Sequence, residues 1–194
     1  MNFLFKNYIH FTPEEAQDIL FIRNEAFVRK NMYNCQIITL KEHFSWLNTL
    51  RHRSDRCYWG IYCDKQLIGS IDLTHINFST MWAEWGFFID KGHLGMGAVI
   101  EFLGMEHFFK ALQFKNILAC VHEKNKKVYH LHKTKFGYEE APQYNIKKDG
   151  QNFYGLTLSV ENWERCRTKI KGILDKLYVI DAVVWEDLAA INVP

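Results

Sequence analysis

The chain has 194 residues, of which 48% are hydrophobic and 24% are charged, and its formal net charge is +2. A chain of this length can bury a sizeable core in one domain, and this composition excludes general disorder. Lysine and arginine are scattered rather than gathered in a basic stripe, and no apolar run reaches the length of a membrane span. We therefore expect neither nucleic acid nor a membrane as a partner.

The five cysteines lie far apart in the sequence. Their spacing does not match a zinc site, and their odd number does not suit a disulfide framework. We therefore expect reduced thiols, no metal ion and a cytoplasmic location.

The first quarter of the chain carries two helix-start signatures, each a threonine followed three residues later by a glutamate. They are Thr12 with Glu15 and Thr39 with Glu42. Such capping boxes satisfy the first backbone N–H groups of a helix. We expect helices over 13–23 and 40–50, a strand over 3–11 before them, and less regular chain over 23–38.

Three antiparallel strands are expected next. Segments 57–63 and 67–78 flank a short polar turn, which predicts a hairpin. Segment 82–89 is rich in aromatic residues and short enough to be a buried strand. We expect it to be the central strand of the sheet.

Three glycines within segment 92–97 separate this strand from an apolar helix that we expect from about Ala98 to Phe109. A helix start holds phosphate well, and glycine lets a ligand approach the backbone closely. The spacing G-x-x-G-x-G differs from the dinucleotide pattern, and no Gly-Lys-Ser/Thr follows as in a P-loop. The glycines indicate either an anion-binding turn or an ordinary turn.

The rest of the chain predicts a strand over 116–121, a helix over 125–135, a strand over 152–160 and a helix after Ser159. The expected class is mixed α/β (α+β), with a mostly antiparallel central sheet flanked by helices. We expect a single domain over 1–175 and an apolar tail over 176–194. The tail either contacts a second copy of the chain, which gives a homo-oligomer, or covers an edge of the sheet.

This order of elements resembles the GNAT superfamily of N-acetyltransferases over roughly residues 3–160. Two motifs carry the resemblance. In segment 92–97, GHLGMG, the two later glycines match the family turn Gln/Arg-x-x-Gly-x-Gly/Ala, whereas the first position departs from it. Asn125 follows a strand, and the helix after it ends at Phe136-Gly137-Tyr138, as in the family.

A narrower resemblance is to PseH-type enzymes, which acetylate the 4-amino group of a UDP-linked 4-amino-dideoxy sugar on the way to pseudaminic acid. It rests on short matches such as Ile22-Arg23-Asn24, Val28-Arg29-Lys30 and Ile68-Gly69-Ser70-Ile71. The resemblance implies a small-molecule acceptor, a UDP-amino sugar, across the sheet from the cofactor. The candidate acceptor-binding residues are Arg23, Asn24, Met32, Tyr33, His43 and His75.

The family resemblance also implies acetyl-CoA as co-substrate. In the family the pantetheine arm lies along the central strand, and the glycine turn takes the pyrophosphate. The candidate cofactor-binding residues are Trp85, Gly86, Phe87, Phe88, Ile89, Leu94, Gly95, Met96, Gly97, Ala98 and Asn125.

Amine acetylation needs an acceptor for the amine proton and a donor for the leaving thiolate. Glu84 is the one carboxylate inside the central strand, and it either draws the amine proton or forms a salt bridge on the sheet face. The family commonly uses a tyrosine seven residues after the asparagine, a position that holds His132 here. An imidazolium can protonate a thiolate near neutral pH. The alternatives are Tyr129 as the acid, or His132 as a helix residue without a catalytic role.

We therefore expect an enzyme, an N-acetyltransferase that moves acetyl from acetyl-CoA to the amine of a nucleotide-linked amino sugar by direct attack. Two alternatives stay open. In the first, the acceptor is a protein N-terminus or a ribosomal protein. In the second, the chain is a non-catalytic acyl-CoA-binding module, and the absence of the family tyrosine favours this alternative.

Overall fold

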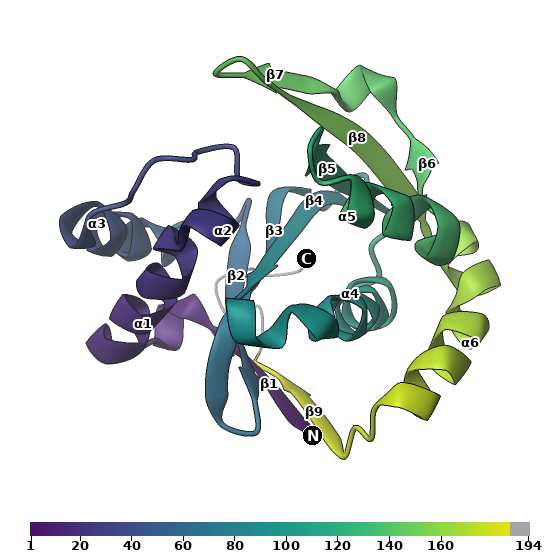
Figure 1. Ribbon diagram of the computed structural model, residues 1–194, viewed down its shortest axis with the longest axis horizontal. Helices are drawn as coiled ribbons and strands as arrows, with labels where there is room; N and C mark the ends of the chain where they lie inside the picture. Colours follow the sequence, from purple (N-terminus) through teal and green to yellow (C-terminus); the bar gives the residue numbers. More distant parts are fainter. Residues whose placement is uncertain (187–194) are drawn as a thin grey trace. The chain divides into compact units, whose positions relative to one another are not determined.

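The computed structural model describes residues 1–186, and these fall into two compact units (Figure 1). Unit 1 comprises Met1–Ile76, Phe87–Gly95 and the chain from Val179, and unit 2 comprises Asn77–Gly86 and Met96–Tyr178. The strands pair mostly antiparallel and helices accompany them, so the predicted mixed α/β class is confirmed. The single domain expected over 1–175 stays a prediction.

Unit 1 contains four strands in the order β3-β2-β1-β9, namely β1 (Asn2–Asn7), β2 (Cys57–Cys63), β3 (Gln66–Asn77) and β9 (Ala182–Trp185). The pairs β1–β2 and β2–β3 are antiparallel, whereas β1–β9 is parallel. The predicted hairpin is present, and its turn residues Asp64 and Lys65 have φ of 47° and 73°. Two successive positive φ values match the turn whose twist suits a two-residue hairpin.

The helices of unit 1 are η1 (Tyr8–His10), α1 (Pro13–Asn24), α2 (Ala26–Arg29) and α3 (Leu40–Leu50), and α1, α2 and α3 gather on one side of its strands (Figure 1). Both predicted capping boxes form, with Thr12 and Thr39 accepting from the backbone N–H groups of Glu15 and Glu42. Buried Tyr8, Ile19 and Leu50 join these helices to the sheet.

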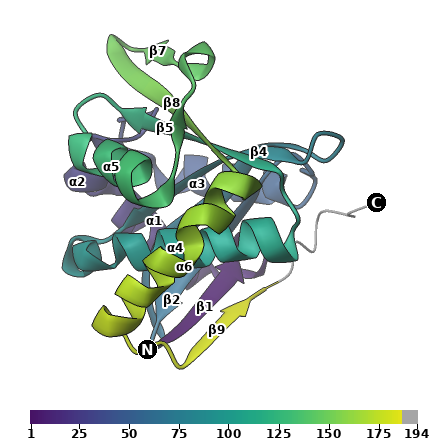
Figure 2. The same cartoon turned by 90° about the vertical axis from the view of Figure 1, so that its right-hand side faces the viewer.

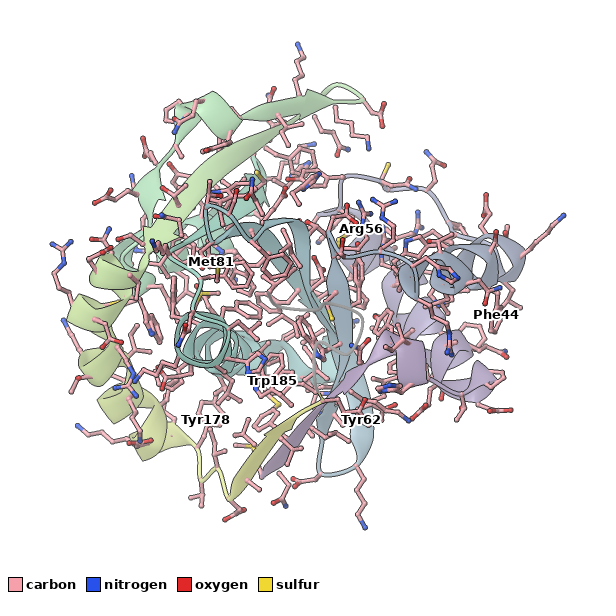
Figure 3. The ribbon with its side chains drawn as sticks, turned by 180° about the vertical axis from the view of Figure 1, so that it is seen from behind. Phe44, Arg56, Tyr62, Met81, Tyr178 and Trp185 are labelled. Carbon is pink, nitrogen blue, oxygen red and sulfur yellow. The ribbon has the colours of Figure 1, made fainter. Side chains whose placement is uncertain are left out.

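The tail adds a strand that periodicity did not predict, because four residues are too few for a period. The Trp185 ring stacks on Phe5 with centroids 3.7 Å apart and an interplanar angle of 3° (Figure 3). The indole N–H of Trp59 donates to the carbonyl of Glu186 at 3.0 Å. Residues 182–185 therefore cover β1, while the remainder of the predicted tail, 187–194, lies outside the described residues.

The strands of unit 2 follow the order β6-β8-β5-β4, with β7 also paired to β8. They are β4 (Trp82–Ile89), β5 (Asn116–His122), β6 (Glu139–Glu140), β7 (Ile146–Lys148) and β8 (Gln151–Ser159). Strand β4 begins in unit 2, and its last three residues, Phe87–Ile89, belong to unit 1. Its parallel register with β5 runs from Trp82↔Asn116 to Glu84↔Leu118.

Two helices dominate unit 2, α4 (Gly97–Glu106) and α6 (Val160–Leu177), which lie close together in Figure 2. The rings of Phe102 and Trp163 are 5.4 Å apart, and Arg167 binds Glu106 through two hydrogen bonds of 2.5 and 2.7 Å. The shorter helical segments are η3 (His107–Ala111), α5 (Lys126–Leu131), η4 (His132–Phe136) and η5 (Pro142–Tyr144).

The predicted helices over 98–109 and 125–135 each end in a π-helical segment, η3 and η4. The second ends where the sequence indicated, at Gly137, whose φ of 79° is a left-handed conformation that glycine adopts readily. Within residues 1–186, no helix is long and apolar enough to cross a membrane. The five cysteines are free thiols.

Candidate active site

The glycine segment forms a short 3₁₀ segment, η2 (Lys91–Met96), which is kinked at His93 (φ −116°, ψ 19°) and leads directly into α4. Asp90 closes the start of η2, because its carboxylate accepts the N–H of His93 at 3.0 Å and lies 2.7 Å from His93 Nδ1. The start of α4 is different. Its N-cap residue, Met96, offers no side-chain hydrogen bond, and its first turn holds no acidic residue.

Two of the three glycines of this segment, Gly92 and Gly95, are not required by packing in the described structure. A Cβ placed on Gly95 would meet nothing within 4 Å, and one on Gly92 would come only to 3.4 Å from Asp90. Neither residue has a positive φ. Open space beside a helix start without a side-chain cap fits an anionic group such as a diphosphate.

The predicted pantetheine segment of β4 divides into buried and half-buried positions. Trp85 and Ile89 are buried, and the residues between them are half-buried. Phe88 packs against the cluster of Tyr8 and Ile19, and its carbonyl lies so close to Gly69 that a Cβ there would come within 2.1 Å of it. Phe88 thus contributes to the core of unit 1, a contact that the sequence did not indicate.

The predicted proton-transfer residues lie on three elements of unit 2. Glu84 is in β4, opposite Leu118 of β5, and only 8% of it is exposed. His132 begins the π-helical segment η4 and is 3% exposed. Tyr129 is in α5, where its hydroxyl donates to Glu140 at 2.6 Å. That hydrogen bond raises the pKa of Tyr129.

His132 has a partner that sequence reasoning missed. Its Nδ1 lies 2.7 Å from Oε1 of Glu101, a residue of α4 that is fully buried. Burial raises the pKa of Glu101, and His132 opposes this effect. A carboxylate within the apolar run Val99–Met105 is the signal that could have revealed it, since a buried charge requires a partner.

Asn125 is the N-cap residue of α5, although its side chain makes no capping hydrogen bond. Its backbone carbonyl accepts the N–H of Tyr129 at 3.1 Å, and its own N–H donates to His122 at 2.8 Å. Asn125 therefore marks the start of α5, and His132 is the first residue after that helix ends.

Two of the predicted acceptor residues, Asn24 and Arg23, bind the irregular segment that follows α2, and Arg29 does so as well. Asn24 bonds Ile38 in both directions, from Nδ2 to the carbonyl at 2.8 Å and from the Ile38 N–H to Oδ1 at 2.9 Å. Arg23 donates to the carbonyl of Asn34 at 2.8 Å. Arg29 donates to the carbonyls of Asn24 and Cys35 at 2.9 and 2.6 Å.

These two arginines lack an acidic counterpart. Among residues 1–186, neither the Arg23 nor the Arg29 guanidinium pairs with a carboxylate, and the buried Nη1 of Arg23 has no hydrogen-bond partner. Burial lowers the pKa of Arg23, and the positive charge of Arg29 lowers it further. Two guanidiniums in this state form a site with affinity for an anion.

The other predicted acceptor residues are spread over unit 1. His43 of α3 is 5% exposed, and burial lowers its pKa. Its Nε2 has no hydrogen-bond partner within the described part of the chain. Met32 and Tyr33 are half-buried in the segment after α2, and His75 is exposed in β3 with a φ of 51°.

The class of this protein follows from comparison with known proteins. Residues 8–138 match the model of the acetyltransferase (GNAT) domain. The chain belongs to the GNAT acetyltransferase family and is an acetyl-CoA-dependent N-acetyltransferase.

Among particular relatives, the acetyltransferase PseH of Campylobacter jejuni is 24% identical over 153 residues, which are 79% of this chain and 91% of that protein. Its crystal structure in complex with acetyl coenzyme A has a TM-score of 0.62 at 22% identity, covering 81% of this chain and 99% of that one. The spermidine N-acetyltransferase of Vibrio cholerae, in complex with CoA and spermine, has a TM-score of 0.72 at 18% identity, covering 84% and 98%. These structures share the fold of this chain.

Proposed function

We propose that the acceptor of this N-acetyltransferase is the amino group of a nucleotide-linked amino sugar. The observation that carries the proposal is the pair of arginines, Arg23 and Arg29, that have no carboxylate partner among residues 1–186. The buried, unpartnered Nη1 of Arg23 would gain a charge-assisted bond from a diphosphate oxygen. The similarity to PseH supports the same class of acceptor.

The same charges disfavour the other amine acceptors. A polyamine is a polycation, and two guanidiniums would repel it rather than attract it. A protein N-terminus carries no diphosphate to neutralise them. We therefore expect the protein to bind UDP even without an attached sugar. Neither a polyamine acceptor nor a protein acceptor predicts this binding.

In this proposal acetyl-CoA is held at the segment Leu94–Ala98 and along β4 from Trp85 to Ile89. The start of α4 has no side-chain cap and no acidic residue in its first turn, which suits the negative pyrophosphate. Bound acetyl-CoA supplies the thioester. The chain supplies the groups that bind it and move protons.

Unit 2 supplies the proposed proton carriers. Glu84 accepts a proton from the amine as its nitrogen attacks the thioester carbon. The C–S bond breaks and its electron pair goes to sulfur, which takes a proton from His132. The products are the acetylated amine and the free thiol of CoA, so one proton leaves the amine and one reaches the sulfur.

A cytoplasmic location and self-association belong to this proposal. Free cysteines suit a reducing compartment. A spermidine N-acetyltransferase of Vibrio cholerae that shares this fold, with a TM-score of 0.65, is dodecameric. Light scattering of the purified chain tests whether it also assembles with copies of itself.

Calorimetric titration tests the acceptor directly. Acetyl-CoA, UDP and a UDP-4-amino sugar are added in turn, and thiol release is followed after mixing. We expect all three ligands to bind and thiol to appear only with the amino sugar. Turnover with an amine but no affinity for UDP would overturn the proposed acceptor.

Two matched variants assign the UDP affinity. Arg23→Lys should weaken UDP binding on the order of tenfold, because a hydrogen bond to a charged group contributes roughly 1.5–3 kcal/mol. Arg51 makes the same kind of bond, from Nη2 to the carbonyl of Ile9 at 2.8 Å, on an exposed surface. Arg51→Lys should leave UDP binding unchanged.

A further inference from the structure

Helix α4 buries a carboxylate within a stretch that is otherwise apolar. Residues Val99–Met105 are all buried, and Glu101 is the one charged residue among them. Taking an ionised carboxylate out of water is strongly unfavourable unless a partner compensates it. The partner is His132, whose Nδ1 is 2.7 Å from Glu101 Oε1, with the two side chains 3% and 0% exposed.

The surroundings of this pair are aromatic and carry no net charge near neutral pH. The Tyr138 ring stacks on the His132 ring at 4.6 Å, and the Trp85 ring lies 5.9 Å from it. Two groups that titrate face the pair from other elements, Tyr138 and Cys166 of α6. Burial raises the pKa of both, so both stay neutral. Aromatic faces favour a cationic imidazole ring.

The charge of the pair decides which protonation state burial favours. An ionised Glu101 beside an imidazolium is neutral overall, whereas the same pair without the second imidazole proton carries a charge of −1. A dry, uncharged environment disfavours the net charge. Glu101 and His132 are therefore coupled through their contact, and the protons of the two groups belong to one system.

We propose that Glu101 is a positioning residue that keeps His132 loaded as the acid of the acetyl transfer, an inference that rests on the proposed role of His132. Glu101 accepts the Nδ1–H bond, which leaves Nε2, on the opposite side of the ring, to carry the proton that passes to sulfur. After the transfer the ring is neutral with its proton on Nδ1, and solvent restores the Nε2 proton. The π-helical turn that begins at His132 supports the assignment, because such turns are frequent at functional sites.

The test compares Glu101→Gln with wild type. The amide oxygen of Gln can still accept the Nδ1–H bond, but the negative charge is gone. We expect the high-pH limb of the kcat profile to move to lower pH by about one unit or more, since an opposite charge at this distance shifts a titration by roughly 1–3 units. The acceptor is whichever amine the wild-type enzyme acetylates, so the test does not depend on the sugar.

Glu106→Gln is the matched control, because Glu106 lies on the same helix and pairs with Arg167 instead. Its pH profile should match that of wild type. A Glu101→Gln profile with an unmoved limb would overturn the inference while leaving the proposed acceptor intact. If the enzyme acetylates another amine but no UDP-amino sugar, the proposed acceptor is wrong and the inference about Glu101 still stands.

A second readout needs neither turnover nor a Glu101 variant. Nitrogen NMR of histidine-labelled wild-type protein reports which ring nitrogen of His132 is protonated, with His132→Gln used to assign the signal. At high pH we expect the neutral ring to hold its proton on Nδ1. A neutral ring with its proton on Nε2 would overturn the inference.

Discussion

Helices α1 and α3 of unit 1 start in a different way from helix α4 of unit 2. In unit 1, α1 and α3 are closed by their own side chains, because Thr12 and Thr39 each form a complete capping box with the glutamate three residues later. In unit 2, α4 begins after a glycine segment with neither a capping side chain nor an acidic residue. The first kind of start stabilises the helix, and the second leaves its positive end without a compensating side chain from the helix itself.

Two glycines of unit 1 show a similar contrast. Gly69 of unit 1 is closed in by the protein itself, since a Cβ there would come within 2.1 Å of the Phe88 carbonyl. Gly95 faces open space. A glycine that packing requires serves the fold, whereas a glycine beside open space serves whatever approaches the backbone.

The largest expected effect separates these two glycines. Gly69→Ala should lower the free energy of unfolding by about 3 kcal/mol, because a β-carbon has to displace backbone. Gly95→Ala should change it by less than about 0.5 kcal/mol. Urea unfolding of both variants measures the difference, and equal losses would refute the contrast.

A smaller effect concerns the ligand. Gly95→Asp places a negative charge beside the start of α4, where we propose that the pyrophosphate binds, and should weaken acetyl-CoA binding about tenfold, or about 1.4 kcal/mol. Gly172→Asp adds the same charge on α6, at a position that also faces open space, and should leave the affinity unchanged. Calorimetry measures both. Equal affinities would show that the start of α4 does not bind the cofactor.

The smallest expected effect tests the helix starts that carry a capping box. Thr39→Ala removes the cap of α3 and should cost about 1 kcal/mol of stability. Acetyl-CoA affinity should stay at the wild-type value, because the cap serves the helix alone. Thermal unfolding and calorimetry on one sample test both statements, and a loss of affinity would contradict the second.

Local features were readable from the sequence because their partners lie within a few residues. The capping boxes, the hairpin around its polar turn and the helix end at Gly137 each depend on neighbouring positions, and the structure has all three. The family was readable for a related reason, since its motifs are short and follow one another in a set order. The choice between His132 and Tyr129 as the acid was not decided by spacing alone.

Long-range partners decided the rest. Strand β9 exists because Ala182–Trp185 meets β1 from the far end of the chain, and four residues carry no period of their own. Glu101 and His132 are 31 positions apart, and only the packing of η4 on α4 makes them a pair. The sequence by itself determined the order of elements and the family, because hydrophobic period and turn chemistry act locally. The tertiary structure decided which charges are buried and what faces them, because burial depends on segments that the sequence keeps apart.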